Sequence, residues 1–422
     1  MTAEYSDSHS DGTVVDVKLF RAIGLFHILN FTAQTGRDGY DGRRHRTVLR
    51  VYFWLVIVTI IFNIGGMYLS YNDFQRFTYL TLCVTVSLPC SLKSYVLSRK
   101  ADTDRLRAVL DMARYAFTSC GRSDPSRLSR RSAALSALLR TFVTINYCTV
   151  FFWMLAPFFI HASLSVTHLD GTVSEYRNSI LNLWVPLPDA AYNSSAGWSV
   201  VYAYEAIVFT GNLIILLMFD CYVLTTCFAL NAHFRTLVDG YTALGRRTPG
   251  PTLGDEYYSR LICLVDDNQR VVKKFYDFYD VVQSVVKLQI ACSTVSGIIS
   301  IFFAILMFMS GWSLVSPPVL KFFSAYVIVM AQLGIYCFAF SYVETAKSAV
   351  NFGLYSSDWT AKDLKFKKTM LLAMKMNSSY QRIAKLTPTN TINLEMLYGV
   401  IKTSYSIVSL LLNTAVELKA EE

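Results

Sequence analysis

The sequence predicts an all-α membrane protein with seven transmembrane helices, and three observations support this fold class. Of the 422 residues, 53% are hydrophobic and only 16% are charged, whereas soluble domains carry about 25% charged residues. The mean hydropathy is +0.36, and apolar residues gather in runs long enough to cross a bilayer. Basic residues alternate between loops in a way that orients these runs. This composition argues against a soluble enzyme, a disordered chain or a small disulfide scaffold.

Six runs have the length and apolar character of a spanning helix, which needs about 20 such residues. They cover residues 48–70, 76–97, 138–163, 199–224, 288–310 and 319–343. A seventh predicted span, 391–416, is the least hydrophobic because charged, hydroxyl and amide side chains interrupt it. Such side chains need contact with water or protein inside a membrane.

The distribution of Lys and Arg predicts the orientation of these spans. Basic residues concentrate before the first span and in the second, fourth and sixth loops, whereas the first loop holds only Arg76 and the third only Arg177. The positive-inside rule therefore places the N-terminus in the cytoplasm and the C-terminus outside the cell. The net charge of +9 then belongs to cytoplasmic loops, and no nucleic-acid partner is expected.

Asn193 begins an Asn-Ser-Ser triplet in the third loop, which this orientation places outside the cell. Such triplets accept N-linked glycans, so the sequence predicts glycosylation at Asn193. Two further triplets, at Asn30 and Asn377, fall on the cytoplasmic side and are expected to be unused. None of the nine cysteines lies in a predicted external loop and their spacing matches no zinc motif, so neither an external disulfide nor a metal site is expected.

Catalytic motifs are absent from the sequence, so an enzyme is not expected. The carboxylate pairs Asp266-Asp267 and Asp277 with Asp280 lie in a basic stretch with helical spacing, which favours a solvated helix face. The chain contains no Gly-rich phosphate loop, no HExxH and no GxSxG pattern. No cofactor is expected either.

The chain divides into four predicted parts. Residues 1–47 form a cytoplasmic N-terminal segment, and residues 48–343 form a six-helix membrane domain with long cytoplasmic helical extensions. One such extension follows the second span, where helical spacing of apolar residues continues to Phe117. Residues 344–390 form a cytoplasmic amphipathic helix and anchor region, and residues 391–422 form the final helix with a short external tail.

The last helical region is predicted to be split into a cytoplasmic part and a spanning part. An apolar stripe that includes Phe366, Met370 and Ala373 lies opposite several lysines, which is typical of an amphipathic helix too polar to span. Pro388 then ends that helix. In the final span, residues at intervals of four, three and four share one face, which is either a pore wall or an ordinary buried surface. They are Ile407, Leu411, Thr414 and Leu418.

Large and aromatic side chains are frequent in the outer halves of the spans. They could form an interfacial belt, or they could face inward and line an apolar pocket for a small neutral ligand. The candidate ligand-binding residues are Tyr79, Phe151, Met154, Phe158, Tyr204, Ile207, Phe322 and Tyr326.

The C-terminal third carries an ordered set of short patterns. These are Trp359, the leucine- and methionine-rich run 371–378, the break at Leu386-Thr387, and the run 402–411 with its Ser-Tyr-Ser triplet. In this order they resemble the insect odorant receptor family, which the rest of the chain matches in length and topology.

The resemblance implies an odorant-sensing subunit of a heteromeric, ligand-gated, non-selective cation channel. It implies a heterotetramer with an odorant receptor co-receptor subunit in the plasma membrane of sensory neurons, surrounded by lipid. A small apolar volatile would bind in the outer half of the membrane domain, and cations would permeate a pore lined by the final helix. Carried over to this chain, the pore-lining residues are Ile407, Leu411, Thr414 and Leu418. The short fourth loop is unlike that of the co-receptor.

Three other classes remain as alternatives. A G-protein-coupled chemoreceptor also has seven helices, but it needs an external N-terminus and usually carries an Asn-Pro-x-x-Tyr motif that this chain lacks. A gustatory-type receptor channel would end in a different C-terminal pattern. A secondary transporter would show Gly- or Pro-broken helices in corresponding halves, whereas Pro89 and Pro157 have no matching partners later in the chain.

Overall fold

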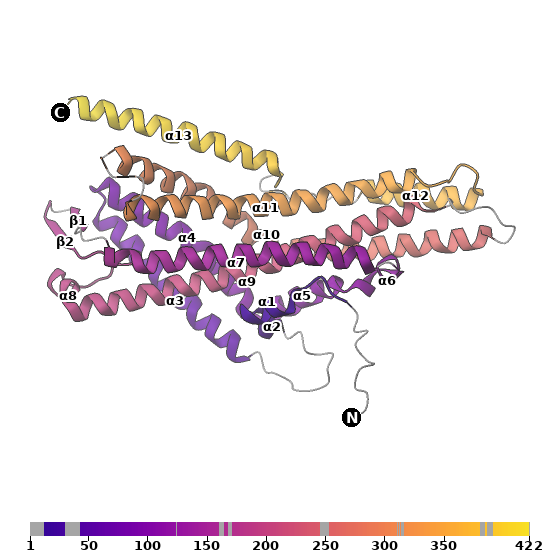
Figure 1. Ribbon diagram of the computed structural model, residues 1–422, viewed down its shortest axis with the longest axis horizontal. Coiled ribbons are helices and arrows are strands. Elements are labelled where there is room, and N and C mark those ends of the chain that lie inside the picture. Colours follow the sequence, from indigo (N-terminus) through magenta and orange to yellow (C-terminus); the bar gives the residue numbers. More distant parts are fainter. Residues whose placement is uncertain are drawn as a thin grey trace.

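The computed structural model is an elongated bundle of long helices (Figure 1). It describes residues 12–29, 43–123, 125–159, 164–167, 171–244, 253–309, 311, 313, 316–379, 385 and 391–421. The helices are α1 (Val17–Ala22), α2 (Leu25–Ile28), α3 (Arg43–Leu69), α4 (Phe74–Ser98), α5 (Lys100–Leu110), α6 (Ser119–Ser123), α7 (Pro125–Phe159), α8 (Asp189–Asn193), α9 (Ser195–Thr242), α10 (Leu253–Met309), α11 (Pro317–Tyr355), α12 (Leu364–Ser379) and α13 (Leu394–Glu421), with 3-10 turns η1 (Asp111–Ala113) and η2 (Tyr115–Phe117). Strands β1 (Leu164–Thr167) and β2 (Val173–Tyr176) form an antiparallel hairpin.

Among the described residues, six helices are long and apolar enough to cross a membrane: α3, α4, α7, α9, α10 and α11. They overlap all six of the strongest predicted spans, because a long apolar run in lipid satisfies its backbone by forming a helix. The predicted span 48–70 passes the end of α3 by one residue, and the predicted ends at 160–163 and 310 lie outside the described residues. The seventh predicted span, 391–416, forms most of α13. A count of seven spans stays a prediction.

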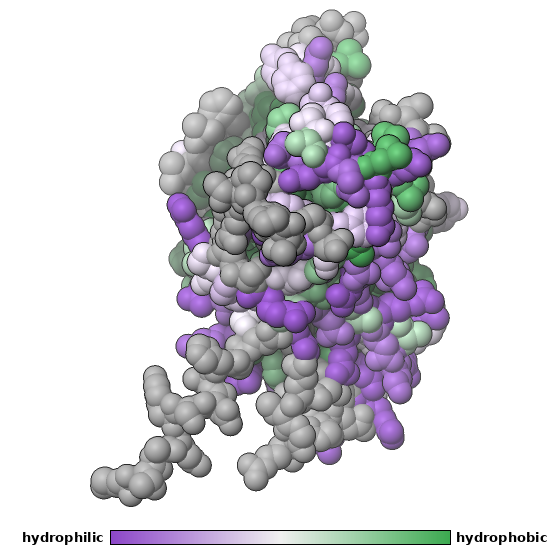
Figure 2. All heavy atoms as spheres, turned by 90° about the vertical axis from the view of Figure 1, so that its right-hand side faces the viewer, coloured by the Kyte–Doolittle hydropathy of each residue, from purple (hydrophilic) through white to green (hydrophobic). Residues whose placement is uncertain are grey.

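The two ends of the bundle differ in character. The hairpin end carries β1, β2 and α8, and the α12 end carries α6, α12 and the prolonged ends of α9 and α10 (Figure 1). Figure 2 views the α12 end, where hydrophilic side chains cover much of the visible surface. This is the arrangement expected of helices that continue beyond the apolar layer of a membrane.

The predicted extension after the second span is wrong in detail. α4 ends at Ser98, Arg99 takes an extended conformation, and α5 ends at Leu110, where 3-10 turns replace the α-helix expected as far as Phe117. The N-terminal segment is the physical reason. The amide of Tyr115 donates to Gly12 O at 2.8 Å, and the amide of Val14 donates to Ala113 O at 2.9 Å. These contacts use backbone groups that a continuous helix would bond within itself.

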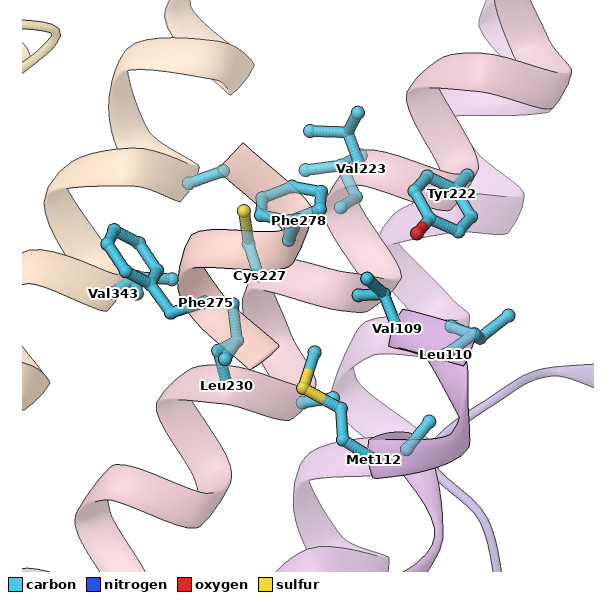
Figure 3. Close-up of a cluster of buried hydrophobic side chains, with 14 of the residues drawn as sticks. Val109, Leu110, Met112, Tyr222, Val223, Cys227, Leu230, Phe275, Phe278 and Val343 are labelled. Atoms are coloured by element: carbon cyan, nitrogen blue, oxygen red, sulfur yellow. The ribbon is translucent and has the colours of Figure 1, made fainter. Parts of the chain in front are cut away.

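The main apolar core surrounds α9, whose side chains are the most completely enclosed of the spanning helices. Figure 3 shows part of it, where Phe275 and Phe278 of α10, Val343 of α11 and Val109 of α5 converge on Val223, Cys227 and Leu230 of α9. α12 adds its predicted apolar stripe to the same core, with Phe366, Met370 and Ala373 buried. The core therefore ties the membrane helices to the α12 end.

Candidate ligand pocket

A cavity of about 130 Å³ lies between α4, α7, α9 and α11, in the half of the bundle nearer the hairpin end. Its lining is mostly apolar. The lining residues are Tyr79, Leu82, Cys83, Val86, Ser87, Cys90, Asn146, Thr149, Val150, Trp153, Leu181, Leu183, Phe209, Asn212, Leu213, Leu216, Ala325, Ile328 and Val329. Small-molecule sites are typically of this kind, apolar with a few placed polar groups.

Aromatic rings form part of the cavity wall. The rings of Trp153 and Phe209 lie 5.5 Å apart in a tilted arrangement. The Trp153 indole N–H donates to Ser324 Oγ at 3.0 Å, and the Tyr79 hydroxyl donates to Leu181 O at 2.7 Å. Because the indole N–H and the phenol hydroxyl are already hydrogen-bonded, both side chains present apolar ring surface to the cavity.

Residues 180–183, which we call the roof, close the cavity on the hairpin side. Leu181 and Leu183 line the cavity, while the buried Glu205 carboxylate accepts hydrogen bonds from both of their amides at 2.8 Å. The buried ammonium of Lys321 donates to Ile180 O at 2.6 Å. Side chains of α4, α9 and α11 therefore hold the roof through its backbone.

A charged cluster lies about one helical turn beyond the cavity on α4, α9 and α11. It consists of Lys93, Asp220, Gln332 and Tyr336. Lys93 Nζ is 2.7 Å from Asp220 Oδ1, and both side chains are almost fully buried. The Tyr336 hydroxyl donates to Asp220 Oδ1 at 2.5 Å, and Gln332 donates to Asp220 Oδ2 at 2.6 Å. Such a pair is stable only when fully hydrogen-bonded, as Asp220 is here.

The sequence-predicted binding residues are spread over several environments. Tyr79 lines the cavity, and the Phe322 ring packs edge-on behind it with the centroids 5.8 Å apart. Tyr204 is instead hydrogen-bonded to Thr59 of α3. Met154 and Tyr326 are half-buried and are not among the lining residues, and three more are exposed on the surface of the bundle. These three are Phe151, Phe158 and Ile207, exposed by 65%, 50% and 60%.

Several lining residues were missed although they lie within a turn of predicted ones. Trp153 neighbours Met154, and Phe209 follows Ile207 by two positions, so the predicted residues and the lining residues share helix turns but lie on different faces. A signal was present in Glu205, because an ionisable residue within a span usually faces the protein interior. Phe209 and Asn212 follow Glu205 at helical spacing on the same face.

The predicted pore-lining residues lie on α13, and the predicted glycosylation site lies at the hairpin end. Ile407 is 37% exposed on α13, while Leu411, Thr414 and Leu418 belong to α13 with side chains outside the described part of the structure. Asn193 ends α8 on the exposed surface of the hairpin end, where its Nδ2 donates to Glu175 O at 2.7 Å.

The sequence and the fold of this chain are similar to those of known proteins. A family model described as 7tm odorant receptor matches residues 73–405. The fold is similar to the structure of the insect olfactory receptor OR5 from Machilis hrabei, with a TM-score of 0.75 at 12% identity. It is also similar to that receptor in complex with eugenol, with a TM-score of 0.73 at 13% identity. Each likeness covers 94% of this chain and 98% of the other.

No match is found among curated proteins. The family model nevertheless spans most of the chain, and the likeness to the solved receptors extends over the whole helical bundle. The chain therefore belongs to the insect odorant receptor family.

Proposed function

We propose that this protein is the odorant-sensing subunit of a heteromeric, ligand-gated, non-selective cation channel. The observation that carries the proposal is the apolar cavity of about 130 Å³ beneath the roof. An engineered apolar cavity of about 150 Å³ in another protein takes up benzene, so a cavity of this size suits a small volatile. Because the lining is mostly apolar, binding removes apolar ligand surface from water.

Gating follows from differential affinity. The odorant binds an open arrangement of the helices more tightly than a closed one, and so shifts the population toward the open arrangement. The cavity is lined by α4, α7, α9 and α11, and α13 packs against α10 and α11. A displacement of α11 on ligand binding would therefore act directly on α13 through their contact.

The final helix α13 lines the pore in this proposal, with Ile407, Leu411, Thr414 and Leu418 facing the ions. A ring of the apolar members, Ile407, Leu411 and Leu418, gates by excluding water. α13 runs along one margin of the bundle (Figure 1). Residues at intervals of four, three and four expose apolar and aromatic side chains along it: Leu394, Tyr398, Ile401 and Tyr405. This stripe is a natural contact surface for other subunits of a heterotetramer that includes the co-receptor.

The orientation places the α12 end in the cytoplasm and the hairpin end outside the cell, in the plasma membrane of sensory neurons. The basic loops support it, because the second, fourth and sixth lie toward the α12 end. The exposed position of Asn193 at the hairpin end fits an N-linked glycan there. The odorant then enters a pocket in the outer half of the membrane.

The test is whole-cell current in cells that express this chain with and without an insect co-receptor, during an odorant panel and with G-protein signalling blocked. We expect a fast cation current that needs both chains and survives the block. A response that the block abolishes would favour a G-protein-coupled receptor instead. Current from this chain alone would contradict the heteromeric assembly.

A further inference from the structure

Three polar side chains line the cavity on the side away from the roof. Ser87 of α4, Asn146 of α7 and Asn212 of α9 are exposed by only 7%, 4% and 6%. Along their helices they lie eight, seven and three residues farther from the roof than Tyr79, Trp153 and Phe209. At the rise of an α-helix, these separations are roughly 12, 10 and 5 Å. We call these three residues the polar floor.

Each residue of the polar floor keeps unused hydrogen-bonding capacity. Asn146 Nδ2 donates to Phe142 O at 2.8 Å, and its Oδ1 accepts no bond from any described residue. Asn212 Oδ1 accepts from the Tyr52 hydroxyl at 3.0 Å, while its Nδ2 has no acceptor within the described part of the chain. The Ser87 hydroxyl makes no hydrogen bond to a described residue.

An Asn side chain offers two donors and one acceptor, so capacity is left over whichever way each amide is turned. Buried polar groups in proteins are almost always hydrogen-bonded, and because these three residues line the cavity, their spare capacity suits a polar group inside it. The opposite end of the cavity has no such need, because the Tyr79 hydroxyl and the Trp153 indole N–H are bonded to the protein.

We infer that the preferred ligands are small volatiles with one hydrogen-bonding head group, a hydroxyl or a carbonyl, on an apolar body. The head group bonds to the polar floor, and the body lies between Trp153, Phe209 and the roof. The cavity volume limits the body to about one aromatic ring or a comparable alkyl chain. This inference rests on the proposed function and names the ligand class of the same pocket.

The polarity of the two ends explains why the class is narrow. A hydrocarbon of the same shape fills the cavity but leaves the polar floor without partners, and a site with buried unpaired groups rejects such a ligand. A ligand with polar groups at both ends would bury one of them against Leu181 and Trp153, whose polar atoms are already bonded. One head group and one apolar end match the cavity.

The test compares ligands of matched shape in cells that express this chain with a co-receptor. Benzyl alcohol and benzaldehyde are each paired with toluene, and 1-hexanol and 2-hexanone are each paired with hexane. We expect the oxygenated member of each pair to activate at a concentration about 10-fold lower or more, which corresponds to one or two hydrogen bonds. The readout is the concentration for half-maximal current.

Asn146→Leu is the decisive variant, because it removes a floor amide at similar volume while the Tyr52 bond to Asn212 stays. It should bring the paired ligands to within about 3-fold of each other, and Ser87→Ala should narrow the gap partly. Asn63→Leu is the matched control, since Asn63 is equally buried on α3 but does not line the cavity. It should leave the ratio unchanged.

The outcomes separate the two proposals. Equal currents from the paired ligands would overturn the ligand class but not the proposed channel function. A preference for the oxygenated ligands that persists in Asn146→Leu, with normal surface labelling, would do the same. Silence toward all six ligands with the co-receptor present would contradict the ligand class and the proposed function together. Loss of surface labelling in Asn146→Leu shifts the decision to Ser87→Ala, which removes only one oxygen.

Discussion

At the scale of single residues, Asp16 illustrates how one buried carboxylate organises a whole segment. Its Oδ1 accepts a hydrogen bond from Leu19 N at 3.1 Å and so caps α1, while its Oδ2 accepts from the Arg140 guanidinium at 2.9 Å. The side chains behind this cap, including Phe20 and Leu25, are fully buried in the main core. Asp16 thus helps to attach the N-terminal segment to α7.

Replacement of Asp16 by Ala should lower the free energy of unfolding at neutral pH by about 1 kcal/mol, the usual cost of a lost N-cap. Burial by itself raises the pKa of Asp16, but the bonds from Leu19 and Arg140 outweigh it and hold that pKa below the ordinary value. A lowered pKa means that the stabilisation is present at neutral pH and is lost as the pH falls through that pKa.

The difference between the native protein and Asp16→Ala should therefore shrink below about pH 4. Thermal unfolding in detergent, followed by tryptophan fluorescence at several pH values, measures it. Asp16→Asn is the control, since it keeps a capping oxygen without the charge. An equal difference at all pH values would contradict the role of the ionised carboxylate.

At the scale of elements, the charged cluster fixes how α4, α9 and α11 face one another. Lys93 and Asp220 are ionisable groups within apolar spans, and each finds its partners only if all three helices keep one rotation. On the neighbouring α7, Trp153 and Asn146 line the cavity, whereas Phe151 is exposed. Sequence periodicity alone could not tell these faces apart, because aromatic residues occur on both.

Lys93→Met should destabilise the protein by about 3–5 kcal/mol, because it leaves the Asp220 carboxylate buried without its counter-ion. The double variant Lys93→Met with Asp220→Leu removes both charges and should recover much of the loss. Surface labelling and thermal unfolding in detergent compare the single and double variants. A single variant as stable as the native protein would show that the pair does not hold these helices together.

At the scale of the whole molecule, the sequence predicts the spanning helices well and their surroundings poorly. Six spans follow from hydropathy, because the cost of unbonded backbone in lipid leaves no alternative to a helix. The end of α5 and the roof depend on backbone contacts between distant segments, such as Tyr115 to Gly12 and Leu181 to Glu205. These contacts join segments that are far apart in the sequence, so no local sequence pattern predicts where α5 ends or how the roof is held.

Assembly into a heterotetramer predicts that the exposed stripe of α13 is covered by another subunit. Tyr398 and Tyr405 are 69% and 76% exposed in the single chain. Their joint replacement by Ala should reduce co-precipitation with the co-receptor several-fold and leave the detergent stability of this chain unchanged, because buried aromatic residues often dominate interface energetics.

Tyr68→Ala is the matched control, because Tyr68 is 74% exposed near the end of α3 and lies outside the stripe. It should leave co-precipitation intact. If the double variant of α13 associates as well as the native chain, the stripe faces lipid and the subunits meet elsewhere.

The roof carries a consequence for how such receptors diversify. Glu205, Lys321 and Tyr79 bond to peptide groups of residues 180–183, while Leu181 and Leu183 line the cavity. Substitutions at these two leucines would reshape the pocket without breaking any of those bonds. If the cavity holds the odorant as proposed, substitutions at these two leucines can change odour preference one side chain at a time without loss of folding.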